Sequence, residues 1–251
     1  MRLIVISLLA LFISLMLVIA GNSYLMTLLG VRLAEVNTAP SDIGWIMTFY
    51  SIGFVVGTIF APRLLIRVGH IRAFAALASL ASIAALSYPF ADDFWTWSAL
   101  RAIGGLSVAG LFIAIESWFS AVASENNRAT LFSLYTITAY SASAGGQVLL
   151  ASEASSGQAT AFILAGLLLI AAVIPLSVSR LQSPPIEHAE FMTPQRLWRK
   201  SALGVFSSFC AGLLISSFYA LAPLYATLNG ISKADISTLM SVSVLSAMAL
   251  A

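Results

Sequence analysis

The sequence has 251 residues, of which 60% are hydrophobic and only 9% are charged. Soluble domains usually carry about 25% charged residues, so the composition excludes a soluble globular protein and predicts a chain surrounded largely by lipid. The net charge of +2 gives no reason to expect a nucleic-acid partner.

Long apolar stretches follow one another along the whole chain. A helix needs about 20 mostly apolar residues to cross a bilayer. In chain order, the predicted spans are Leu3–Leu29, Ile43–Ile66, Ala73–Phe90, Trp95–Phe119, Thr130–Ala151, Ala159–Ser179 and Leu203–Leu224. An eighth stretch begins near Ile236 and reaches Ala251 after 16 residues, which is less than a full crossing. The sequence therefore predicts an all-α, polytopic transmembrane helix bundle whose last helix is cut short.

Basic residues are concentrated in every second connection between these spans. One set of connections and the N-terminus hold nine of them: Arg2, Arg63, Arg67, Arg72, Arg128, Arg180, Arg196, Arg199 and Lys200. The other set holds two, Arg32 and Lys233. Because basic loops stay on the cytoplasmic side, this bias predicts a cytoplasmic N-terminus. The expected location is the bacterial inner membrane.

The tryptophans lie near predicted span ends, as the aromatic belts of membrane proteins do. They are Trp45, Trp95, Trp97, Trp118 and Trp198. We therefore expect all of them at the two membrane surfaces.

The longest connection divides the chain into unequal parts. We expect residues 1–179 to form a six-helix bundle, residues 180–201 to be a cytoplasmic linker and residues 202–251 to begin a second, incomplete bundle. The sequence after the linker resembles the beginning of the chain. Tyr24 precedes Asp42 by 18 residues, and Tyr219 precedes Asp235 by 16 residues, with each aspartate opening the next apolar helix.

This layout resembles the major facilitator superfamily. The family's loop between the second and third helices carries the pattern Gly-x-x-x-Asp-Arg-x-Gly-Arg-Arg. In this sequence Arg67, Gly69 and Arg72 match that pattern. Pro62 and Ile66 stand where the glycine and the aspartate are expected. This departure puts in doubt the interhelical contact that the aspartate makes in the family.

Two further motifs bear on the resemblance. Arg101 and Gly105 match an Arg-x-x-x-Gly element of the family's fourth helix. Gly145 and Gly146 match part of a glycine-proline motif in the fifth helix of antiporters, but the proline is missing. The resemblance is closest to bacterial efflux-type members. It implies a secondary transporter of a small solute that works by alternating access, with proton-coupled efflux as one form.

Arg101 is the most costly residue to place in a membrane. It lies about six residues inside the fourth predicted span, and an arginine at the centre of a membrane helix costs about 2.5 kcal/mol or more. It is therefore expected to face the bundle interior as a substrate or proton-relay group. The alternative is an arginine that extends toward the outer interface, near Asp92 or Asp93.

Glu116 is the one carboxylate inside a predicted span. A desolvated glutamate binds a proton more readily, which would suit proton exchange. The alternative is a structural ion pair with an arginine at the cytoplasmic side, such as Arg63 or Arg128.

Other polar residues interrupt the apolar spans and are candidates for a substrate or proton pathway. They are Asn22, Tyr140, Gln147 and Tyr219. The alternative for each is a hydrogen bond between helices, which contributes about 0.6 kcal/mol on average in membranes.

The sequence contains no nucleotide-binding loop and no hydrolase or zinc-protease motif. His70 and His188 are both expected to be solvated, so no catalytic residue, metal site or cofactor is predicted. The expected partners are the lipid bilayer, a small-molecule substrate and protons. The alternatives to a transporter are a non-transporting membrane receptor or assembly protein on the same fold, or a non-functional fragment.

Overall fold

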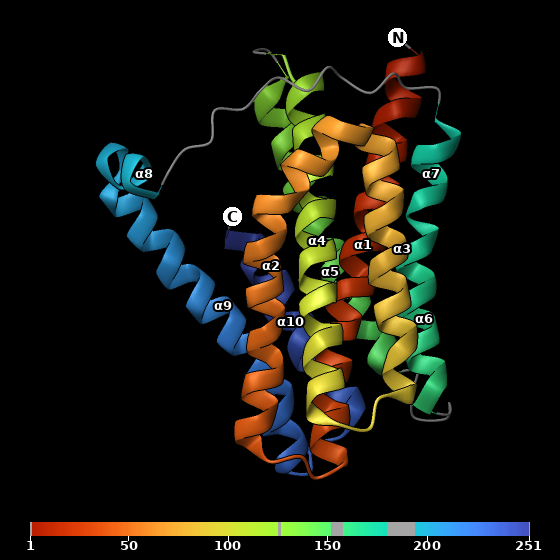
Figure 1. Ribbon diagram of the computed structural model, residues 1–251, viewed down its shortest axis with the longest axis vertical. Helices are drawn as coiled ribbons and strands as arrows, with labels where there is room; N and C mark the ends of the chain where they lie inside the picture. The colour runs from red at the N-terminus through yellow and green to blue at the C-terminus, as the bar shows by residue number, and fades with distance from the viewer. Residues whose placement is uncertain (1, 125–126, 152–157, 180–193, 251) are drawn as a thin grey trace.

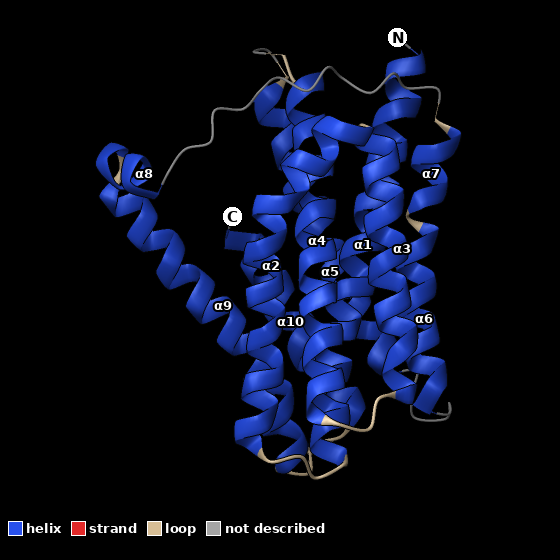
Figure 2. Cartoon of the chain, viewed as in Figure 1, coloured by secondary structure: helices blue, strands red, loops and turns tan. Residues whose placement is uncertain are grey.

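The computed structural model describes residues 2–124, 127–151, 158–179 and 194–250, and within these ranges it contains helices and no strand (Figure 2). The predicted fold class, an all-α transmembrane bundle, is confirmed. The helices are α1 (Arg2–Glu35), α2 (Pro40–Val68), α3 (His70–Ser87), the 3-10 helix η1 (Tyr88–Phe90), α4 (Phe94–Val122), α5 (Arg128–Leu149), α6 (Gln158–Ala171), α7 (Val173–Val178), α8 (Pro194–Lys200), α9 (Ala202–Leu228) and α10 (Lys233–Leu250).

Six helical segments of the described chain are long and apolar enough to cross a membrane. They correspond to the predicted spans one to four, six and seven. The fifth predicted span forms α5, whose 22 residues are long enough to cross at ~1.5 Å per residue, but its many hydroxyl and amide groups make it more polar. The sixth span is divided into α6 and α7 at Ala172, because Pro175 has no N–H to bond the carbonyl of Ala171.

The helices run alternately up and down, so that the basic connections lie together (Figure 1). The start of α1, the α2–α3 connection and the start of α5 share one end of the bundle, and α8 stands apart from the bundle on the side toward that end (Figure 1). We call this end the arginine-rich end and the other the opposite end. Arg32, predicted in a loop, instead lies in the last turn of α1 at the opposite end.

Glycines bring α2 and α4 into backbone contact. A β-carbon added at Gly53 would lie 2.0 Å from the carbonyl oxygen of Ala102, and one at Gly105 would lie 2.0 Å from that of Tyr50. Gly146 on α5 meets Ala20 of α1 in the same way, at 2.4 Å. Small residues therefore allow the closest helix approaches of the bundle, as is common in membranes.

The apolar core is divided into two clusters, one toward each end of the bundle. The cluster at the arginine-rich end draws its buried residues from α1 to α5, from α7 and from Ala172 just before it. The cluster at the opposite end also contains Leu224 and Ala226 of α9 and Ile236 and Met240 of α10. The last two helices therefore share a core with the rest of the protein only at the opposite end.

The first part of α9 is exposed. Phe209 is 63% exposed and Leu214 is 72% exposed, and Figure 1 shows α9 slanting away from the other helices toward α8. Nearer its end, α9 packs on α1, where a β-carbon at Gly30 would lie 3.4 Å from Pro223. The α9 helix thus touches the bundle at the opposite end and separates from it toward the arginine-rich end.

A single residue, Gly69, separates α2 from α3. Its φ of 84° is a conformation that glycine adopts most readily. The next residue, His70, is only 2% exposed, with its Nε2 atom 2.9 Å from the Ser117 hydroxyl and its ring beside Trp118. The prediction of a solvated His70 is wrong, because the short turn folds His70 back against α4. Trp118 is buried between the helices, at 1% exposed.

Asp93 begins α4. Its carboxylate accepts hydrogen bonds from the backbone amides of Trp95 and Thr96 and from the Thr96 hydroxyl. These bonds hold the pKa of Asp93 below its ordinary value. They also commit this carboxylate to the helix start, as an N-cap residue does.

The glycine contacts can be tested by comparing two neighbouring residues of α4. Gly105→Ala should lower the free energy of unfolding by about 1–3 kcal/mol, because the new β-carbon forces α2 and α4 apart. Gly104→Ala is the control, since a β-carbon there meets nothing within 4 Å. Thermal unfolding in detergent measures both variants. Equal unfolding temperatures would contradict the close approach.

Candidate functional site

Arg101 lies inside the bundle with only 2% of its surface exposed. Its guanidinium carbon is 4.3 Å from the centre of the Tyr50 ring, and its Nη2 atom is 2.9 Å from the sulfur of Met26. Tyr88 of η1 interacts with the same guanidinium. Arg101 therefore does not extend to Asp92 or Asp93, and the interior placement is the one observed.

Asn22 joins this group through Tyr50, whose hydroxyl lies 3.2 Å from the Asn22 amide oxygen and donates to it. Two sequence candidates, Arg101 and Asn22, thus meet around a tyrosine that was not a candidate. We call Asn22, Met26, Tyr50, Tyr88 and Arg101 the arginine cluster. It brings four elements together: α1, α2, η1 and α4.

A second polar group joins α1 to α5 around Gln147. The Thr27 hydroxyl donates to the Gln147 side-chain oxygen at 2.6 Å, and the Gln147 amide nitrogen donates to the Ser23 hydroxyl at 2.7 Å. Ser23 and Ser143 hydroxyls lie 2.9 Å apart. Gln147 and Thr27 are fully buried, so the group fits the helix-to-helix hydrogen bonding that was the alternative to substrate binding.

The same group extends to α9 and α10. The Tyr219 hydroxyl of α9 lies 3.3 Å from that of Ser143. From α10, Ser237 donates to the Gln147 carbonyl at 2.7 Å and Ser241 to the Ala144 carbonyl at 3.2 Å. Tyr140, another sequence candidate, is half-buried near Tyr219. We call these contacts the serine network.

Glu116 lies apart from both groups, toward the arginine-rich end of α4. Its carboxylate is exposed and accepts a hydrogen bond of 2.9 Å from the Tyr135 hydroxyl of α5. No ion pair with Arg63 or Arg128 occurs in the described chain. Its observed partner is a phenol, and the structural ion pair considered as an alternative is not formed.

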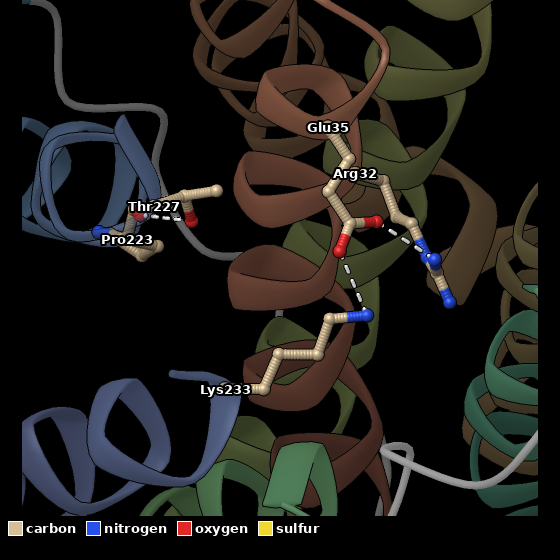
Figure 3. A network of polar contacts seen from close by, with 5 residues as sticks. All are labelled: Arg32, Glu35, Pro223, Thr227 and Lys233. Atoms are coloured by element: carbon tan, nitrogen blue, oxygen red, sulfur yellow. Dashed lines mark hydrogen bonds and ion pairs between the residues drawn. The ribbon is translucent and has the colours of Figure 1, made fainter. Parts of the chain in front are cut away.

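At the opposite end, Glu35 forms ion pairs with two cations. Arg32, one turn earlier on α1, lies 2.8 Å from its carboxylate, and Lys233 at the start of α10 lies 2.9 Å away (Figure 3). Figure 3 also shows the Thr227 hydroxyl donating to the Pro223 carbonyl within α9. The Glu35–Lys233 pair is the ionic link between the last helices and α1.

The residues that match the family's loop pattern, Arg67, Gly69 and Arg72, lie at the arginine-rich end. Arg67 and Arg72 are exposed on either side of Gly69, and Ile66, at the aspartate position of the family pattern, is 50% exposed. No group of three or more His, Cys, Asp or Glu residues suited to a metal ion occurs in the residues that the structure covers.

Five important residues were not found from the sequence. Tyr50 and Met26 belong to helices far from Arg101 along the chain, and only the fold brings them together. Glu35 and Lys233 carried a weak signal, since opposite charges stand in two connections at the same end. Tyr135 lay among the polar residues of its helix without a marked role.

Comparison with known proteins gives a consistent result. The sequence profile of the Major Facilitator Superfamily matches residues 11–251. The chain is 27% identical over 239 residues to the uncharacterized MFS-type transporter YcaD of Salmonella newport (strain SL254), and the match covers 92% of this chain and 60% of that protein. The Salmonella typhi protein of the same name matches equally well.

The fold is similar to solved structures as well. A bacterial homologue of the human lysosomal transporter Spinster, in an inward-facing and unoccupied conformation, aligns with a TM-score of 0.67 at 14% identity. The alignment covers 95% of this chain and 60% of that one. The occupied, inward-facing form aligns with a TM-score of 0.65 at 15% identity. The chain thus spans about 60% of the length of the relatives that it matches.

The serine network can be tested at its centre. Gln147→Leu leaves the buried Thr27 hydroxyl without its acceptor and should lower the free energy of unfolding by about 1–3 kcal/mol. Thr136→Val is the control, because this exposed hydroxyl bonds only within its own helix, to the Phe132 carbonyl. Thermal unfolding in detergent compares them. Should both variants unfold at the same temperature, Gln147 would not hold α1 to α5.

Proposed function

The chain belongs to the major facilitator superfamily, and from this membership we propose that the protein is a secondary transporter of a small solute, working by alternating access. It is an integral membrane protein, and its bacterial relatives support a place in the inner membrane. In this mechanism a site between two helix bundles opens to each side of the membrane in turn.

The distribution of basic residues supports the orientation. The arginine-rich end would face the cytoplasm, which places the N-terminus inside. The exposed Arg67 and Arg72 then stand at the cytoplasmic surface, and the Glu35–Lys233 pair stands at the outer surface.

The packing supports a division into two bundles. Residues 1–179 would form the first bundle, residues 180–201 the cytoplasmic linker and residues 202–251 the start of the second. Of the linker, residues 180–193 lie outside the described range. Within the described chain, α9 and α10 join the first bundle chiefly through α1 and α5, as a separate unit would.

One observation carries the proposal: α9 and α10 are held to the first bundle at the proposed outer end. At the proposed outer end, the shared core, the serine network and the Glu35–Lys233 pair hold them to the first bundle. At the proposed cytoplasmic end, the core contains no residue of either helix. The outer end is thus closed between the two parts of the described chain, as it is in one of the two states that alternating access requires.

Glu116 suits a role in proton coupling. Its carboxylate is exposed toward the cytoplasmic end and is held by one phenol rather than by a cation. A carboxylate that water can reach, and that a hydroxyl rather than a cation holds, is available to take part in proton transfer. Proton-coupled efflux is the form of transport that this placement favours.

Flux through proteoliposomes tests the function and the coupling together. The full protein should move at least one member of a panel of radiolabelled sugars, amino acids and organic acids when a pH gradient is imposed. Glu116→Gln should abolish uptake driven by the pH gradient while leaving solute exchange intact, because the glutamine amide does not ionise and so cannot take up and release a proton.

Tyr135→Phe is the matched control for Glu116→Gln, since it removes the hydrogen-bond donor and keeps the carboxylate. Uptake driven by the pH gradient should persist in this variant. If no solute moves in the wild type, the transporter assignment fails and a receptor or assembly role takes its place. If Glu116→Gln keeps the wild-type pH dependence, only the coupling assignment fails.

The outer closure gives a second test. Lys233→Glu places a repelling charge against Glu35 and should favour opening of the outer end. With Cys210 replaced by serine and Asn22 by cysteine, labelling by a membrane-impermeant maleimide from outside should rise about two- to fivefold, as the loss of a partly exposed ion pair suggests. Adding Glu35→Lys should restore the original labelling. Unchanged labelling in Lys233→Glu would exclude the pair as part of the closure.

A further inference from the structure

The arginine cluster contains a buried cation without a buried anion. The ion pairs of the described chain lie at Glu35, and none of its carboxylates pairs with Arg101. The Nε atom of Arg101 is buried and has no hydrogen-bond partner within the described residues. Four elements surround this charge, so it does not face lipid.

The neighbours of Arg101 compensate its charge only in part. The Tyr50 ring provides a cation–π contact, which is weaker than a charge pair. The Met26 sulfur is a weak acceptor, and the Tyr88 hydroxyl hydrogen-bonds the guanidinium but carries no charge. A guanidinium carries five N–H donors, and a desolvated charge without a partner of opposite sign is strongly destabilising. The cluster therefore lacks one component, an acceptor that carries negative charge.

The geometry of arginine indicates which acceptor would fit. The planar guanidinium matches groups with two adjacent oxygens, which it binds through two parallel hydrogen bonds. Asn22 belongs to the same cluster. Its amide oxygen already accepts a hydrogen bond from Tyr50, and its amide nitrogen is able to donate. A carboxylate would satisfy the open donors of both residues.

There is open space on α4 at Gly104, close to Arg101 along the helix. Gly104 lies three residues further along α4, hence on a neighbouring part of the same face, and a β-carbon there would meet nothing within 4 Å. The adjacent Gly105, in contrast, contacts the Tyr50 carbonyl directly. Asn22 and Met26 are half-buried. An approach from the proposed cytoplasmic side therefore passes Gly104 before it reaches the guanidinium.

We propose that the arginine cluster binds the carboxylate of a small organic anion through Arg101 and Asn22. The inference rests on the proposed function in one respect: the bound anion is the class of solute that the protein moves. Tyr50 and Tyr88 position the guanidinium, and Gly104 leaves the path to it open.

Direct binding of radiolabelled benzoate to the full protein in phosphatidylcholine nanodiscs tests this site. Benzoate should bind saturably, succinate should compete, and benzylamine, which has a similar ring and the opposite charge, should not. Arg101→Gln should weaken binding about tenfold or more, as the loss of a charge-assisted hydrogen bond does. Arg101→Lys should retain part of the affinity, because it keeps the charge and loses the two-pronged geometry.

Two further variants separate binding from folding. Gly104→Leu places a larger side chain in the open space at Gly104, so the protein should lose benzoate binding. Its unfolding temperature, measured beside that of Gly104→Ala, checks that the variant folds. Arg63→Gln removes an exposed arginine of the arginine-rich end and should leave binding unchanged. The proposal is overturned if benzoate does not bind the wild type, or if it binds Gly104→Leu as well as the wild type.

A lipid phosphate offers similar oxygens, and the nanodisc composition distinguishes the two sources. Adding phosphatidylglycerol should leave benzoate affinity unchanged. If phosphatidylglycerol instead competes with benzoate, and this competition disappears in Arg101→Gln, the site belongs to lipid and the solute assignment is overturned. Because binding is measured without flux, a protein that binds benzoate and transports nothing would refute the transporter and keep the anion site. A protein that transports other solutes and does not bind benzoate would refute the anion site and keep the transporter.

Discussion

The close approach of α2 and α4 is the constraint on which the arginine cluster depends. Gly105 meets the carbonyl of Tyr50, so the backbone contact that packs the two helices also fixes where the Tyr50 ring stands. That ring covers the Arg101 guanidinium, only one turn of α4 away. A larger residue at Gly53 or at Gly105 would move the Tyr50 ring and the Arg101 charge apart. Packing and electrostatics at this site are therefore a single arrangement.

The sequence predicted much of the fold because the bilayer imposes a simple rule: each crossing needs a long apolar helix. It also predicted that Arg101 would be interior, since lipid makes any other place costly. It could not identify Tyr50 or Met26, whose closeness to Arg101 arises from packing between distant segments. His70 was misjudged for a related reason. A histidine in a basic loop looks solvated, until a one-residue turn at Gly69 folds it onto α4.

The polar residues of the spans fall into two kinds that the sequence alone did not separate. Gln147 is fully buried and hydrogen-bonded to α1, so its polarity serves cohesion. Glu116 and Tyr140 remain partly open, so their polarity is available to water or to a solute. Both kinds lower the hydropathy of a span in the same way, and only their burial and their hydrogen-bond partners distinguish them. This difference also explains why α5 is less apolar than the other spans while lying within the bundle.

Two buried hydrogen bonds that hold α10 on α5 have main-chain acceptors. Ser237 and Ser241 donate to main-chain carbonyls, those of Gln147 and Ala144. Every residue type supplies such a carbonyl, so the acceptor side of this contact places no demand on side-chain identity. Substitutions along α5 can then accumulate without matching changes on α10, whereas loss of either serine removes a bond outright. Mutational tolerance across this contact should be one-sided, with α10 the less variable partner.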